Sequence, residues 1–151
     1  MNEYKNVTKK VEKAKETLKE HGYTCKVLAE ELIKWFETDT IVDDIGLDEV
    51  LKEPFLVIHE LVEIGEVKRM GLKITKDVII KNPEKIERAH LKAAEVEFEI
   101  AEKLGDYNHL EKRLKHVKAW CNDPTVPPEY KEKYRELYNK TERIINDCKE
   151  K

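Results

Sequence analysis

The sequence predicts an all-α fold, an antiparallel bundle of four long helices plus two short helices in a single domain spanning residues 1–151. Three observations support this prediction. Apolar residues recur at steps of three and four along most of the chain, which is the period of a helix. Prolines and glycines stand at the ends of several of these periodic segments. No repeat, low-complexity tract or long linker divides the chain.

The first predicted helix runs from residue 4 to residue 37. Its apolar seam continues in steps of four and three without a slip, through Val7, Val11, Ala14, Leu18, Gly22, Cys25, Ala29, Leu32 and Phe36. Glycine costs about 1 kcal/mol relative to alanine inside a helix. We therefore expect a close helix crossing or a bend at Gly22.

The helical period breaks between Thr38 and Glu53. Asp43, Asp44 and Gly46 are typical of a turn, and residues 47–52 are typical of a short helix. The adjacent aspartates could bind a hard cation through their oxygens, although capping is the commoner role of such a pair in a loop.

The segment from Pro54 to Met70 is the helix around which we expect the chain to be organised. Proline at its first position and Gly71 just beyond it mark the two ends. Its apolar side chains point almost all the way round, as expected for a helix covered on most sides. His59, Glu63 and Glu66, at positions i, i+4 and i+7, nevertheless form one polar line on it.

A second helix carries polar residues on an apolar face. Residues 75–80 predict a short helix, with a strand as the alternative, and Asn82-Pro83 then starts a helix over residues 83–104. His90 and Glu97 lie in the middle of its apolar face, with small alanines around them. Two further helices follow, over residues 108–121 and 128–148.

These misplaced polar groups favour a metal site. A buried charge without a partner costs several kcal/mol, so carboxylates on apolar faces require a counter-charge. One or two divalent cations held between the helices 54–70 and 83–104 would supply it, and the candidate ligands are His59, Glu63, Glu66, His90 and Glu97. Mixed nitrogen and oxygen donors suit Fe, Mn or Zn better than Ca. If the protein is an enzyme acting on a small molecule, the metal would activate water for hydrolysis, with an unligated Glu66 as base.

Two other interpretations stay open. In the first, the buried polar groups are structural: the carboxylates pair with Arg69 or Arg113, or the groups fix helix register in a non-catalytic interaction module, expected to be a homodimer. In the second, Arg113 binds a phosphate or nucleotide together with His109 and His116, which share one edge of the helix 108–121. For Glu60 and Glu87 we expect surface or outer-shell roles.

Short motifs give partial resemblances only. The Glu87-x-x-His90 unit resembles the unit repeated in ferritin-like di-iron bundles, but no second copy occurs in this sequence. His59-Glu60-x-x-Glu63 is similar to a zincin helix in which the second histidine is replaced by glutamate. Neither resemblance assigns the chain to a family.

Composition excludes several functions. The chain carries 29 basic and 32 acidic residues, a formal net charge of −3, so no strong field attracts it to nucleic acid or an anionic membrane. No segment approaches the roughly 18 uninterrupted apolar residues of a membrane helix, and the N-terminus lacks the apolar core of a signal peptide. Three cysteines without CxxC spacing are typical of free thiols, which predicts a cytoplasmic protein.

Overall fold

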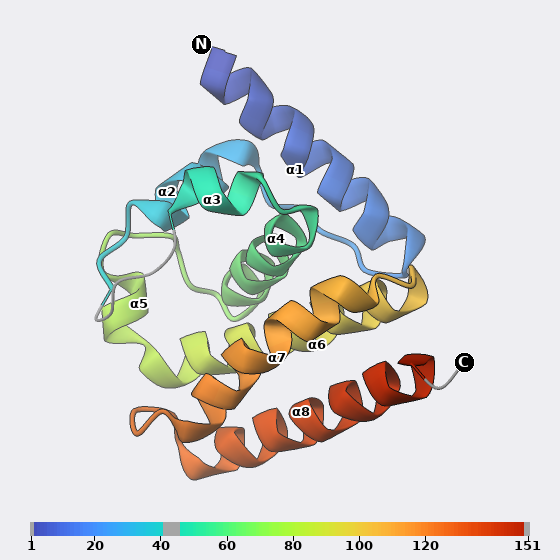
Figure 1. The fold of residues 1–151 in the computed structure, drawn as a ribbon. Coiled ribbons are helices and arrows are strands. Elements are labelled where there is room, and N and C mark those ends of the chain that lie inside the picture. The colour runs from blue at the N-terminus through green and yellow to red at the C-terminus, as the bar shows by residue number, and fades with distance from the viewer. Residues whose placement is uncertain (1, 41–45, 150–151) are drawn as a thin grey trace. The chain divides into compact units, whose positions relative to one another are not determined.

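The structure, a computed structural model, describes residues 2–40 and 46–149. Asp43 and Asp44, the possible cation ligands of the first loop, lie outside the described residues. Within this part of the chain there are eight helices and no strand, so the predicted all-α class is confirmed (Figure 1). The helices are α1 (Asn2–Glu20), α2 (Ala29–Phe36), α3 (Leu47–Leu51), α4 (Pro54–Arg69), α5 (Val78–Lys81), α6 (Pro83–Lys103), α7 (Tyr107–Asn122) and α8 (Pro128–Lys149).

The prediction of one helix over residues 4–37 is wrong, because the chain turns at Gly22. This glycine has φ +81°, a left-handed conformation that side-chain-bearing residues rarely adopt. The Tyr23 N–H donates to the Leu18 carbonyl at 2.9 Å, and the Gly22 N–H donates to the Lys19 carbonyl at 3.0 Å. This pair of hydrogen bonds is a Schellman motif, which ends α1. A loop over residues 21–28 then leads to α2.

The packing divides the chain into two compact units, residues 1–93 and 94–151, with the boundary inside α6. We describe each unit by itself. In the first unit, α4 packs against α1, α2 and α3 (Figure 1). The prediction that this helix is covered on most sides is confirmed by its buried apolar residues, which are Val57, Ile58, Leu61, Val62, Ile64 and Val67.

Local signals explain where α4 begins and ends. Pro54 occupies the first turn, where the missing N–H breaks no helical hydrogen bond. At the other end, Leu72 donates to the Val67 carbonyl and Gly71 has φ +84°, so the same motif that ends α1 ends α4. The predicted start and stop of this helix are therefore confirmed.

The second unit consists of the C-terminal half of α6 together with α7 and α8. The last two helices pack along each other and run in opposite directions, joined by a short connection over residues 123–127 (Figure 1). Asp106 caps α7 by accepting a hydrogen bond from the His109 N–H at 3.1 Å. Tyr134 is fully buried between the two helices, and its ring centroid lies 5.4 Å from that of Trp120.

None of the helices in residues 2–40 and 46–149 combines the length and the apolar character that crossing a bilayer requires.

Candidate metal centre

His59 and Glu63 lie one helical turn apart on α4. The 3.6-residue period places positions i and i+4 on the same face, so the two side chains point in the same direction. Both are buried, with 4% and 7% of their surface exposed. The His59 Nε2 atom and the Glu63 Oε1 atom are 3.5 Å apart, which is longer than a hydrogen bond between such groups.

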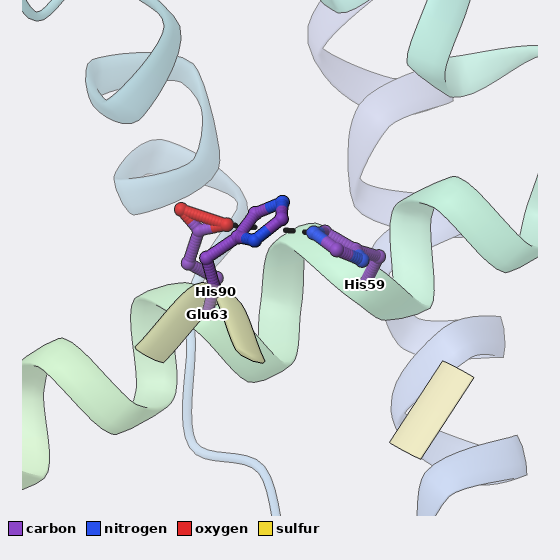
Figure 2. Close-up of side chains that lie close together, drawn as sticks. All are labelled: His59, Glu63 and His90. Carbon is purple, nitrogen blue, oxygen red and sulfur yellow. Dashed lines mark ion pairs between the residues drawn. The ribbon is translucent and has the colours of Figure 1, made fainter. Parts of the chain in front are cut away.

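His90 approaches this pair from α6. Its ring centroid lies 5.0 Å from that of His59, and the two rings meet edge to face with an interplanar angle of 66°. Figure 2 shows the two imidazoles and the Glu63 carboxylate next to one another. His90 is the most exposed of the three residues, since it is only half-buried.

The three side chains could hold a metal ion. Each offers one ligand atom, and these atoms all lie within 4.8 Å of one another. Two ligands of a tetrahedral ion with bonds of about 2.05 Å are separated by roughly 3.3 Å. The 3.5 Å between His59 and Glu63 is close to that value. The ligand atom of His90 also lies within 4.8 Å of the other two, so the three side chains are candidates for one shared ion.

Glu66, the fourth candidate ligand and the expected base, is held by other residues of the first unit. Its Oε1 atom accepts a hydrogen bond from the Tyr23 hydroxyl at 2.7 Å and a second from Arg69 Nη1 at 3.1 Å. Arg69 also lies over the Tyr23 ring, 4.9 Å from its centroid, and donates to the Thr24 carbonyl at 2.7 Å. This contact joins the end of α4 to the loop after α1.

Burial raises the pKa of the Tyr23 hydroxyl well above its usual range, and the hydrogen bond to Glu66 adds to the effect. The phenol therefore stays protonated at neutral pH and acts as a donor. Glu66 has the arginine partner that the ion-pair interpretation expected.

Glu97, the fifth candidate ligand, belongs to the second unit and is completely buried. Its Oε2 atom lies 2.6 Å from His109 Nε2 and accepts from Arg113 Nε at 2.9 Å, while its Oε1 atom accepts from Arg113 Nη2 at 3.1 Å. The Arg113 guanidinium thus donates two parallel hydrogen bonds to the Glu97 carboxylate. The sequence predicted a metal ion as the counter-charge of Glu97. In the structure, the guanidinium of Arg113 balances this negative charge.

The residues of the phosphate-binding alternative take part in this same network. Arg113 and His109 are each only 8% exposed, and the Arg113 N–H groups and the His109 Nε2 atom are directed at Glu97. Arg113 Nη1 also lies 3.3 Å from Nδ1 of the exposed His116. Partial burial of the ring against Arg113 lowers the pKa of His116, and the charges of the neighbouring Arg113 and Lys115 lower it further. Histidine in that state is neutral at pH 7 and contributes little to anion binding.

Sequence reasoning missed two polar partners of α4. Tyr23 was assigned to the interior of a helix that ends before it. Trp35, on α2, is 5% exposed, and its Nε1–H donates to Glu60 Oε2 at 3.1 Å. The indole N–H of a buried tryptophan needs an acceptor. Trp35 in the sequence was therefore a signal that an acceptor such as Glu60 would lie nearby. Glu60, which follows His59 in the sequence, therefore connects α4 to α2 through this hydrogen bond.

No family model, no curated protein and no solved structure matches this chain. Its function is accordingly inferred from the side chains of the centre.

Proposed function

We propose that this protein binds one divalent transition-metal ion through His59, Glu63 and His90. The observation that carries the proposal is the convergence of these three ligand atoms within 4.8 Å on mostly buried side chains. Two of them come from one turn of α4 and the third from α6, so the site joins elements that are distant in sequence.

A comparison of the two buried glutamates supports this assignment. Glu97 is surrounded by nitrogen donors of Arg113 and His109 at 2.6 to 3.1 Å. Glu63 instead has an imidazole nitrogen at 3.5 Å and a second imidazole close by. His59 and Glu63 thus form a long ion pair, and its 3.5 Å separation is close to that of two ligands sharing one tetrahedral ion.

The donor set limits the metal. Two imidazoles and one carboxylate match the His₂Glu set of catalytic zinc sites and the two-histidine, one-carboxylate set of non-haem iron(II) sites. Ca²⁺ and Mg²⁺ prefer sites composed of oxygen ligands. We therefore propose Zn²⁺, Fe²⁺ or Mn²⁺ as the occupant, with Zn²⁺ as the first ion to test.

The reaction class that we propose for such an ion is hydrolysis. Three protein ligands leave a position for water, and a bound divalent ion lowers the pKa of that water toward neutrality. We assign no role as base to Glu66 in this proposal, because Tyr23 and Arg69 already hold its carboxylate. The ion-pair interpretation is the better account of Glu66 and Glu97.

The test uses protein produced without a polyhistidine tag, which would itself bind metal. Zn²⁺ is titrated calorimetrically into apo protein, and we expect one ion per chain. The His59→Ala/His90→Ala double variant should lose this binding. The partly exposed His21, which lies outside the centre, is the matched control, and His21→Ala should bind Zn²⁺ as the wild type does. Equal Zn²⁺ binding by the wild type and the double variant would overturn the proposal.

A further inference from the structure

We infer that the ion bound by His59, Glu63 and His90 takes a small monoanionic ligand from solution, such as a carboxylate, as its fourth ligand. This inference rests on the proposed function and adds the class of ligand that the site accepts. It follows from the charges of the site, from its burial and from the engagement of the neighbouring carboxylates.

The three protein ligands do not neutralise a divalent ion. Histidine binds a metal as the neutral imidazole, so His59 and His90 bring no charge. Glu63 brings a single negative charge. A divalent ion in this site therefore carries a net charge of plus one with its ligands.

A net charge is unfavourable in this position. His59 and Glu63 are only 4% and 7% exposed, so the ion would be largely shielded from water. Buried charge that is not compensated costs several kcal/mol, because low-dielectric surroundings solvate it poorly. A monoanion on the open position removes this charge, as hydroxide formed from bound water would, whereas a ligand that stays neutral does not.

The other two carboxylates of α4 are hydrogen-bonded to other residues. Glu66 accepts hydrogen bonds from Tyr23 and Arg69, and Glu60 accepts one from Trp35. Among the described residues, the group of ligand atoms within reach of one ion consists of His59, Glu63 and His90. We therefore infer that the fourth ligand comes from solution rather than from the described residues, and His90 is the most exposed of the three ligands.

The experiment uses Co²⁺ as the probe metal, because its visible absorption reports changes in coordination. Apo protein is loaded with one equivalent of Co²⁺ in buffer free of chloride and carboxylates, and azide is added. We expect a spectral change that saturates at one azide per cobalt. Formate should produce a comparable change, whereas formamide, a neutral molecule of similar shape, should produce none.

Variants separate the sources of the fourth ligand. Glu87 lies one turn before His90 and is the nearest acidic residue in sequence on α6. We expect Glu87→Gln to leave azide binding unchanged. If azide changes the spectrum only in Glu87→Gln, the chain supplies its own fourth ligand and the inference is overturned.

The remaining outcomes distinguish this inference from the proposed function. Stoichiometric Co²⁺ binding with a spectrum that neither azide nor formate changes would overturn the anionic ligand and leave metal binding intact. Equal responses to formate and formamide would also overturn it. The absence of Co²⁺ binding in both wild type and Glu87→Gln would overturn the proposed function, and the inference with it.

Discussion

Two buried glutamates illustrate how the same residue type serves different purposes in this protein. Glu97 is fully buried and bound by Arg113 and His109, and it needs no further partner for its charge. Glu63 lies beside two imidazoles and has no arginine among its described contacts. The first arrangement is a structural ion pair, and the second is the group of side chains that we propose as metal ligands.

The ion pair at Glu97 predicts a large loss of stability when one partner is removed. Glu97→Ala leaves Arg113 buried without its counter-charge, and we expect a loss of about 3–5 kcal/mol. Glu99 is the matched control on the same helix, since its carboxylate pairs with Lys103 at 2.9 Å with more than half of its surface exposed. Glu99→Ala should cost about 0.5 kcal/mol or less. Urea unfolding measures both values, and equal losses would contradict the assignment.

Tyr23 predicts a pH dependence at the alkaline end. Burial and the hydrogen bond to Glu66 raise its pKa above the ordinary value of 10.0. A group whose pKa is raised in the folded state contributes its full stability below the unfolded pKa. That contribution is lost as the pH rises from about 10 through the folded value, because only the unfolded chain then ionises.

The variant Tyr23→Phe removes this titration. We therefore expect the free energy of unfolding to fall more steeply above pH 10 in the wild type than in Tyr23→Phe. Urea unfolding at a series of pH values between 8 and 11.5 measures the difference. Parallel curves for the two proteins would show that Tyr23 titrates in its usual range.

At the scale of the element, glycine positions decide where helices end. Gly22 ends α1 with φ +81°, and alanine there is strained even though open space surrounds the position. Gly65 lies inside α4, and an added Cβ would meet Val27 and the Tyr23 hydroxyl at 3.7 and 3.8 Å, which is ordinary contact. The two glycines should therefore respond to alanine in opposite ways.

We expect Gly22→Ala to destabilise the protein by about 1 kcal/mol or more, because alanine is disfavoured in the left-handed region. Gly65→Ala should stabilise it by up to about 1 kcal/mol, because alanine favours the helix and no clash opposes it. Thermal unfolding compares the variants. Stabilisation by Gly22→Ala would indicate the continuous helix over residues 4–37 after all.

The sequence predicted the helices well and their partners less well. The i, i+4 spacing of His59 and Glu63 is a local property, so periodicity alone placed them together. The residue that faces this pair comes from another helix, and periodicity does not identify it. His90 and Glu97 share one apolar face, so both were predicted as ligands. The structure places His90 at the pair, whereas Glu97 contacts His109 and Arg113 on α7. A bend or close crossing was expected at Gly22, but the end of the helix there was missed because the residues beyond it happen to continue the helical period.

At the scale of the whole molecule, the candidate centre lies entirely within the first unit, in its described residues 2–40 and 46–93. Binding to the folded state alone stabilises a protein, by about 2.7 kcal/mol when the free ligand is at 100 times its dissociation constant. Zn²⁺ should therefore slow hydrogen exchange in α4 and in the first half of α6. The His59→Ala/His90→Ala variant should show no such slowing, and slowing in that variant would place the metal elsewhere.

The ion's position is the most direct test of the central claim. Crystals of the protein loaded with Zn²⁺ would be measured on both sides of the zinc absorption edge. We predict one strong anomalous peak at about 2.0–2.2 Å from a ring nitrogen of His59, a ring nitrogen of His90 and a carboxylate oxygen of Glu63. A peak at other residues, or no peak in crystals grown with Zn²⁺, would contradict the account.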